Sequence, residues 1–210
     1  MSTQIGLFGG SFDPIHHGHL IAARSVVEQL ELDRMILIPS ARPPHKLGVA
    51  LTAGPKRLAM VRLAIDGEPG MDASDVELTR TGPSYTFDTV REFQRQLGAG
   101  AALHWIIGTD SLADLKHWHR VAELLEACRI VTVARPGWDR PDLSSIREVL
   151  SPSAFSRLTD GILDTPRIDI SATDIRRRVA AGRSIRFLVP DSVERYVRRE
   201  GLYVDRRGGA

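Results

Sequence analysis

The sequence predicts an α/β fold: a Rossmann-like, doubly wound and mostly parallel sheet with helices on both faces. Apolar runs typical of buried strands alternate along the chain with segments whose apolar residues recur at helical spacing. Two of these runs end in the glycine-containing turns Gly9-Gly10 and Gly108-Thr109-Asp110. Because ligands of such sheets bind beyond the carboxyl ends of the strands, these turns predict where a ligand lies.

The first part of the chain predicts two strands and two helices. A buried strand near residues 4–9 leads into a helix at about 18–30, and an apolar run predicts a second strand at 34–39. The segment 40–54 holds two consecutive prolines and no hydrophobic period, so we expect a mobile loop that closes over a ligand. Pro55 then opens a helix, since proline is favoured in the first helical turn.

The middle of the chain predicts a third strand, a turn and a long helix. The strand is expected at 71–78 and the turn at 79–84. The helix is expected to end near Leu97 and to have Thr86 as its N-cap. A fourth strand is expected at 102–107.

The next segment predicts shorter elements. A short helix and a second one at 121–127 are expected to flank Trp118, and a fifth strand is expected at 129–134. The polar segment 138–160 predicts helix plus loop, and residues 162–163 predict a short sixth strand.

The last part of the chain predicts two helices. Residues 170–174 are expected to cap a helix over 175–181, and a further helix is expected at 191–200. We therefore expect one domain over residues 1–204, of which 170–204 is the helical C-terminal part.

Composition narrows the class of protein. The chain has 210 residues, of which 42% are hydrophobic and 26% charged, as in globular proteins. No signal peptide or membrane span is expected, and residues 205–210 predict a disordered tail. The chain has a single cysteine, Cys128, which excludes an intrachain disulfide and predicts a cytoplasmic protein. The net charge is only +2, without a basic stripe, so nucleic-acid binding is not favoured. The oligomeric state stays open, with a homo-oligomer as one option.

The stretch Ile5–Leu20 carries the most specific signal. It predicts a strand, a glycine-containing loop and a helix start, a geometry that presents backbone N–H groups and a positive dipole end to an anion. Two imidazoles, His16 and His19, lie where such an anion would bind, and Gly18 between them allows close approach. The simpler alternative is a glycine turn followed by surface histidines.

The same stretch matches neither a Walker A loop nor a dinucleotide fingerprint. Its string His16-His17-Gly18-His19 resembles the H-x-G-H signature of the nucleotidyltransferase superfamily. The order of later segments sharpens this resemblance to the bacterial nicotinate-nucleotide adenylyltransferases. These segments are Pro43-Pro44-His45-Lys46, Pro83-Ser84-Tyr85-Thr86, Gly108-Thr109-Asp110-Ser111 with Trp118, and Ile170-Ser171-Ala172-Thr173-Asp174-Ile175-Arg176.

The resemblance implies adenylyl transfer from ATP to nicotinate mononucleotide, a step of NAD biosynthesis. It implies catalytic roles for His16, His19 and Arg176. Ala172 departs from the family pattern, which more often has serine at this position, so one hydroxyl contact is missing. The residues implied to bind ATP are Gly9, Gly10, Ser11, Phe12, His16, His19, Gly108, Asp110, Ser171, Thr173 and Arg176.

The resemblance also implies an acceptor site. Trp118 matches the tryptophan that stacks on the pyridine ring, while Trp105, inside a strand, fits a core role. Lys46 and Arg135 are candidates for the phosphate or carboxylate of the acceptor, with a purely structural role as the alternative. The residues expected to bind the mononucleotide are Lys46, Tyr85, Thr86, Trp118 and Arg135.

Three points stay open at this stage: the metal ion, the substrates and whether the chain turns ATP over. Mg²⁺ is implied by the triphosphate, with no protein cage expected for it, whereas zinc is not favoured because the histidines lack cysteine partners or a metalloprotease helix. The acceptor could instead be nicotinamide mononucleotide, phosphopantetheine or glycerol phosphate, with cytidylyl transfer as a variant. The chain could also be an adenine-nucleotide sensor without turnover.

Overall fold

The computed structural model describes residues 2–43, 50–137, 143–148 and 150–204. They form a five-stranded parallel sheet with the strand order β3-β2-β1-β4-β5. Strand order therefore reverses between β1 and β4, which is the switch point of a doubly wound sheet. The predicted fold class is confirmed. The strands are β1 (Thr3–Gly10), β2 (Arg34–Pro39), β3 (Met71–Ala73), β4 (Ala101–Gly108) and β5 (Arg129–Val133).

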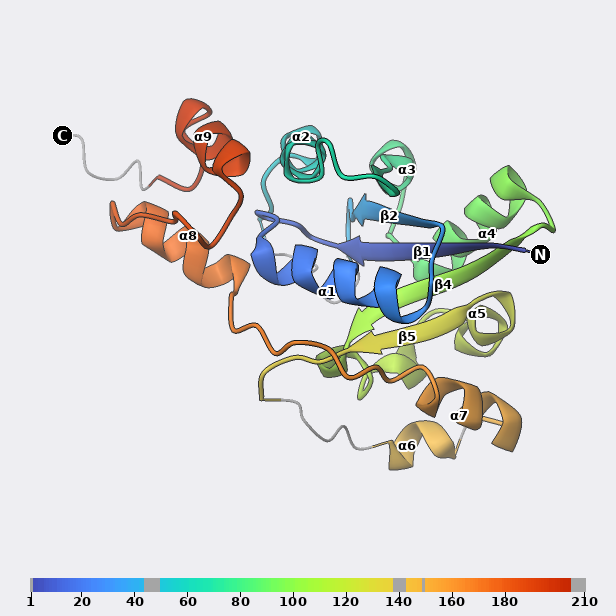
Figure 1. Cartoon of the computed structure of the whole chain (residues 1–210). Helices are drawn as coiled ribbons and strands as arrows, with labels where there is room; N and C mark the ends of the chain where they lie inside the picture. Colours follow the sequence, from blue (N-terminus) through green and yellow to red (C-terminus); the bar gives the residue numbers. More distant parts are fainter. Residues whose placement is uncertain (1, 44–49, 138–142, 149, 205–210) are drawn as a thin grey trace.

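Helices cover both faces of this sheet (Figure 1). The α-helices of the first half are α1 (His17–Gln29), α2 (Gly54–Ala64), α3 (Val76–Thr79) and α4 (Thr86–Leu97). Those of the second half are α5 (Val121–Ala127), α6 (Ser144–Arg147), α7 (Pro152–Thr159), α8 (Ala172–Ala180) and α9 (Asp191–Arg199). Two 3₁₀ turns follow β4, η2 (Thr109–Ser111) and η3 (Leu115–His117).

The sheet separates two hydrophobic cores, because successive side chains of a strand point to opposite faces. In β2, Met35 and Leu37 belong to the core shared with α1, α2, α8 and α9, whereas Ile36 and Ile38 belong to the core shared with α4, α5 and α7. Strands buried on both faces appear in the sequence as continuous apolar runs. For this reason the runs predicted β2 at its observed bounds and β1, β4 and β5 within one residue at each end.

Four local predictions are wrong. The third strand stops at Ala73, and its expected second half forms the short helix α3. Residue Ile162 makes only an isolated bridge to Thr132 instead of a sixth strand. Helix α8 begins at Ala172, three residues before its expected start.

The fourth correction concerns the start of α4. Its N-cap is Tyr85, and Thr86 is the first helical residue. The side chain expected at the cap is therefore inside the helix. The predicted core role of Trp105 is confirmed, since its side chain is only 4% exposed.

Candidate functional site

The loop between β1 and α1 lies at the carboxyl end of the central strand, beside the start of α8 (Figure 1). Gly9 is required there by space, because a Cβ atom would come within 2.6 Å of the Trp105 ring. Phe12 is 1% exposed and has a φ of 45°, so only its backbone can reach a ligand. The loop is thus a fixed backbone surface with its largest side chain turned into the core.

His16 and His19 lie face to face at the start of α1. Their ring centroids are 3.7 Å apart and the planes differ by 25°. The backbone N–H of His16 donates to His19 Nδ1 at 3.3 Å. A neutral His19 therefore carries its proton on Nε2. The two imidazoles therefore lie together at the start of α1.

His16 is the more buried of the two, with 3% exposure. Burial, together with the smaller effects of the charges of Arg135 and His17, lowers its pKa to about 3. Its Nδ1 atom is buried and has no hydrogen-bond partner among the residues that the structure describes. His16 is therefore neutral at pH 7, and it can donate to a phosphate without carrying a full charge.

The start of α8 reaches the same loop. Ser171 caps the helix by accepting a hydrogen bond from the Asp174 N–H at 3.1 Å. Arg176 Nη1 donates to the backbone carbonyl of Asp13 at 2.8 Å, and its Nη2 donates to Thr173 Oγ1 at 3.3 Å. Two segments 163 positions apart in the sequence thus place imidazoles and a guanidinium together.

The segments that follow β4 and β5 contribute a pair of opposite charges. Arg135 Nε lies 3.4 Å from Asp110 Oδ2, and the Arg135 N–H donates to Thr109 Oγ1 at 3.0 Å. The Asp110 carboxylate approaches Gly108 closely, so a Cβ atom at this position would displace the carboxylate. The pair follows the carboxyl ends of β4 and β5, at the same edge of the sheet as the histidines, and the charge of Arg135 contributes to the lowered pKa of His16.

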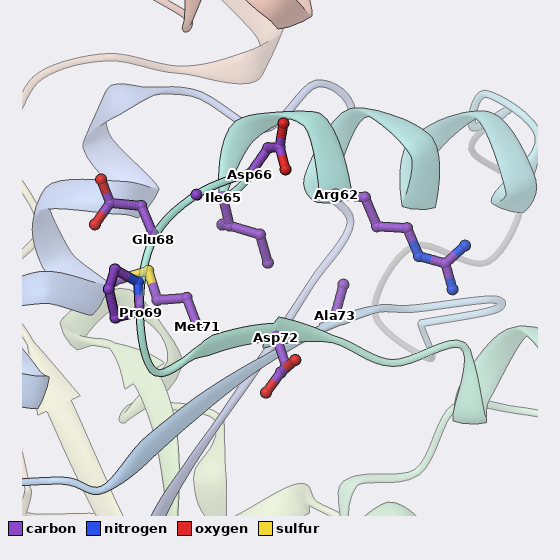
Figure 2. Close-up of a pocket in the computed structure, with 9 residues that line it drawn as sticks. Arg62, Ile65, Asp66, Glu68, Pro69, Met71, Asp72 and Ala73 are labelled. Atoms are coloured by element: carbon purple, nitrogen blue, oxygen red, sulfur yellow. The ribbon is translucent and has the colours of Figure 1, made fainter.

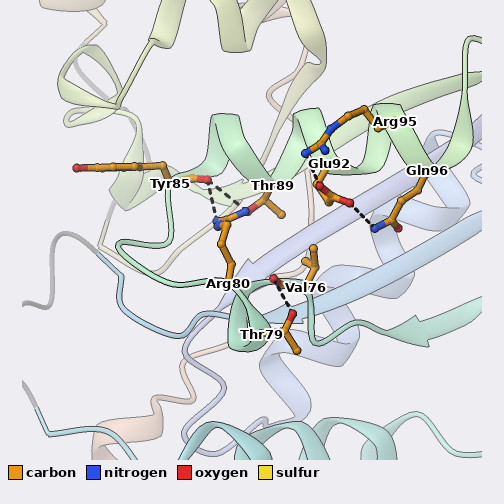
Figure 3. A network of polar contacts seen from close by, with 8 residues as sticks. All are labelled: Val76, Thr79, Arg80, Tyr85, Thr89, Glu92, Arg95 and Gln96. Atoms are coloured by element: carbon orange, nitrogen blue, oxygen red, sulfur yellow. Dashed lines mark hydrogen bonds and ion pairs between the residues drawn. The ribbon is translucent and has the colours of Figure 1, made fainter.

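The start of α4 forms the other side of the site. The Tyr85 ring stacks on the His119 ring, with the ring centroids 4.3 Å apart. The backbone carbonyl of Tyr85 accepts a hydrogen bond from Arg80 Nη2 at 3.5 Å (Figure 3). Arg80 also donates to Thr89 Oγ1 at 3.0 Å. Ser84 Oγ accepts from the N–H groups of residues 41 and 42, which ties this start to the end of β2. The first N–H groups of any helix have no partner within the helix, so they are open to an anion.

The remaining acceptor candidates are placed less closely. Trp118 follows η3, is partly buried and packs against the second core. Lys46 lies outside the described residues, as does the rest of the segment 44–49 of the predicted mobile loop.

Four residues of the site region were missed from the sequence. Asp13 and Arg57 are each 2% exposed, Glu77 is 3% exposed, and Tyr203 is partly buried. Arg57 donates to three backbone carbonyls, those of Ser11, Ser40 and Thr52 at 2.6 to 2.7 Å. The four missed residues are not related by any periodic spacing in the sequence. In the sequence, Arg57 is visible only as one charged residue of a predicted helix.

Glu77 supports the acceptor side from beneath. Its Oε1 accepts from Thr89 Oγ1 at 2.8 Å. Burial raises the pKa of this carboxyl, while the hydroxyls of Thr89 and Ser84 and the charge of Arg80 partly offset the rise. The buried carboxyl therefore joins α3 to the start of α4.

An open hollow of about 440 Å³ lies elsewhere (Figure 2). It is bounded by the end of α2 and by β3, and its lining includes Arg62, Glu68 and Asp72. The turn that leads into β3 lies at the edge of the sheet where the parallel strands begin. The histidines lie at the opposite edge, where the strands end. The hollow is therefore separate from the site.

Within the described ranges, no group of three or more His, Cys, Asp or Glu side chains is placed to hold a metal ion. None of the described helices is both long and apolar enough to cross a bilayer.

The chain is similar to known proteins in sequence and, separately, to solved structures in fold. Residues 7–178 match the model of the cytidylyltransferase-like family. A protein of Thermomicrobium roseum described as a probable nicotinate-nucleotide adenylyltransferase is 43% identical over 96% of this chain and 92% of its own length. One of the same description from Dehalococcoides mccartyi is 37% identical over 97% and 98%. The solved nicotinic acid mononucleotide adenylyltransferase of Plasmodium falciparum, complexed with NaAD, superposes with a TM-score of 0.74 at 15% identity, over 96% of this chain and 97% of that one.

Proposed function

The chain belongs to the cytidylyltransferase-like family, within it to the nicotinate-nucleotide adenylyltransferases, and from this premise we propose how its site carries out the reaction. It transfers an adenylyl group from ATP to nicotinate mononucleotide, a step of NAD biosynthesis. A phosphate oxygen of the mononucleotide bonds to the α-phosphorus of ATP. The bond from that phosphorus to the bridging oxygen breaks, and pyrophosphate leaves with the electron pair.

The attacking phosphate is already ionised, so the site needs no general base. Catalysis then consists of positioning the two substrates in line and of stabilising negative charge on the departing phosphates. The single observation that carries this proposal is the hydrogen bond from Arg176 to the carbonyl of Asp13. This bond ties the guanidinium to the loop that leads into His16 and His19, which supports a shared role of the three side chains toward the phosphates.

On the ATP side, His19 donates from Nε2 and His16 donates as a neutral imidazole. The N-terminus of α8 adds N–H groups, with Ser171 at its cap and Thr173 against Arg176. Gly9, Gly10 and Ser11 offer backbone to the triphosphate. Gly108 and Asp110 receive the adenosine part at the switch point of the sheet.

On the acceptor side, we assign the nicotinate carboxylate to the start of α4, with Tyr85 and Thr86. Trp118 stacks on the pyridine ring. Arg135 is held near His16 by its pair with Asp110, and this supports a role toward the phosphate of the mononucleotide. Lys46 keeps the same assignment as a proposal from sequence.

Mg²⁺ fits this site as an ion that arrives with ATP. The carboxylate oxygens of Asp13 are both hydrogen-bonded, and Asp110 is paired with Arg135. The ion would therefore be held mainly by phosphate oxygens and water, an arrangement that Mg²⁺ favours. When bound, it neutralises charge on the phosphates.

The test is release of pyrophosphate from ATP and Mg²⁺ in the presence of one acceptor at a time. Nicotinate mononucleotide should give deamido-NAD at the highest kcat/KM. Nicotinamide mononucleotide, phosphopantetheine and glycerol phosphate serve as competitors, and CTP replaces ATP in a parallel series. Faster turnover with another acceptor or with CTP would overturn the assignment, and ATP binding without any turnover would make the chain a sensor.

A further inference from the structure

The buried carboxylate of Asp13, in the loop between β1 and α1, links distant parts of the chain. Asp13 is 2% exposed, and both of its carboxylate oxygens are occupied. Oδ1 accepts from the Tyr203 hydroxyl at 2.6 Å, and Oδ2 accepts from the Thr52 N–H at 3.0 Å. A charge-assisted bond from a hydroxyl at this distance is among the stronger hydrogen bonds in proteins. Tyr203 thus holds a residue 190 positions away.

The same residue also holds Arg176. The Asp13 carbonyl accepts from Arg176 Nη1 at 2.8 Å, and the other terminal nitrogen of that guanidinium reaches Thr173. Because the side chain of Asp13 is fixed at both oxygens, its carbonyl is fixed as well. The orientation of the guanidinium therefore depends on the bonds that hold Asp13.

Tyr203 keeps this contact at a conformational cost. Its φ is 63°, in the left-handed region that is unfavourable for residues with a Cβ atom. Such a conformation persists where the surroundings fix it, here the buried Leu202 on one side and the bond to Asp13 on the other. Burial and the Asp13 charge raise the pKa of the Tyr203 hydroxyl, so it remains a donor.

We propose that Tyr203 is a positioning residue for adenylyl transfer: its hydroxyl holds Asp13, and Asp13 holds the guanidinium of Arg176 against the departing pyrophosphate. This inference rests on the proposed function. It adds Tyr203, which follows α9, to the residues that serve the reaction. Tyr203 is not among the residues assigned to either substrate, and in this proposal it acts through Asp13 and Arg176.

The experiment is a double-mutant cycle with Tyr203→Phe and Arg176→Ala. Tyr203→Phe removes only the hydroxyl and should lower kcat/KM for ATP about tenfold, a usual size for coupled residues. KM for nicotinate mononucleotide should stay unchanged. In the Arg176→Ala background, Tyr203→Phe should cause no further loss, because the group it positions is gone. Tyr196→Phe, on α9 and outside this network, is the matched control and should behave as wild type.

The affinity for pyrophosphate, measured by calorimetry, separates the possible failures. Tyr203→Phe should weaken pyrophosphate binding about tenfold, and Tyr196→Phe should not. A wild-type protein that binds pyrophosphate but does not use nicotinate mononucleotide would contradict the proposed function and leave the role of Tyr203 measurable. Equal losses from Tyr203→Phe with and without Arg176, or wild-type pyrophosphate affinity in Tyr203→Phe, would overturn the inference.

Discussion

The phosphate half of the site, residues 9–19 and 171–176, differs from its acceptor half, which comprises Tyr85, Thr86, Trp118 and Arg135. The phosphate half has a buried and densely bonded centre, with His16 at 3% exposure and Asp13 held at three oxygens, whereas Thr173 and Asp174 at its α8 edge are exposed. The acceptor half comes from separate elements, and its side chains are partly exposed. The Arg135 side chain, for example, is 48% exposed.

This difference indicates a division of work. A fixed set of donors suits charge stabilisation, which depends on groups that need no rearrangement during the reaction. Partly exposed side chains on separate elements can select the acceptor without disturbing those donors. Changes in the phosphate half should therefore lower turnover for every acceptor, whereas changes in the acceptor half should alter the preference between acceptors.

The largest effect is expected from His19→Ala, in the phosphate half. Loss of one preorganised donor should lower kcat by about a hundredfold or more. The reduction should be equal for nicotinate and nicotinamide mononucleotides, because the imidazole faces the ATP phosphates. Steady-state kinetics with both acceptors measures this.

The matched control is His17→Ala, one helical position after the His16 cap, where we assign no role to the imidazole. It should retain wild-type kcat, and both variants should keep their thermal unfolding midpoint. Turnover near wild type in a folded His19→Ala protein would remove His19 from the catalytic residues and weaken the contrast between the two halves.

The contiguous part of the fold and site could be predicted because its signals are local. The apolar runs of β1, β2, β4 and β5 are buried on both faces, so their identity and bounds were visible in the sequence. Strand β3 is an edge strand of three residues, too short for a pattern to show where pairing ends. The predicted start of α8 was late because Ser171 caps the helix directly and Ala172 is already helical.

The hydrogen bonds of Asp13 and Arg57, around the loop between β1 and α1, could not be predicted from local sequence pattern. The contacts of Asp13 join positions 39, 163 and 190 residues away, and none of these separations has a sequence signature. Asp13 was visible only as part of a turn. Arg57 was visible only as one residue of a helix, although it is among the largest fully buried side chains. Tertiary contacts, rather than local pattern, define these roles.

A smaller effect is expected in the pH dependence of stability, and it too should be confined to the phosphate half. Burial, together with the charges of Arg135 and His17, holds the pKa of His16 at about 3, against about 6.5 for a histidine in an unfolded chain. As the pH falls below 6.5, the unfolded chain binds a proton that the folded protein does not. The free energy of unfolding should therefore drop by about 2 kcal/mol between pH 7 and pH 5 from this group.

Denaturant unfolding at both pH values measures the drop in wild type and in His16→Gln. The drop should be smaller by that amount in His16→Gln, because the substituted amide does not titrate. His119→Gln, at an exposed position in the acceptor half, should retain the wild-type difference between the two pH values. A His16→Gln protein with the full wild-type difference would show that the imidazole is not buried as a neutral group.

The smallest effect is expected from Thr86→Ala, in the acceptor half, and it concerns preference rather than rate. Nicotinate and nicotinamide mononucleotides differ only in carboxylate against amide. The helix start at Tyr85-Thr86 favours an anion by about 0.3–2 kcal/mol. An amide would also face its NH₂ group toward those donors in one orientation, and each unpaired buried group costs about 1–3 kcal/mol. The wild-type preference for nicotinate should therefore be at least about tenfold.

Thr86→Ala removes the hydroxyl but keeps the backbone donors, so the ratio of the two kcat/KM values should shrink without disappearing. Trp118→Ala is the matched change in the same half, and it should weaken both acceptors about equally because stacking treats the two rings alike. Both variants should keep the wild-type affinity for pyrophosphate, which binds in the other half. If Trp118→Ala abolishes the preference and Thr86→Ala leaves it intact, then the carboxylate is read at the tryptophan, and the start of α4 has no part in selecting the acceptor.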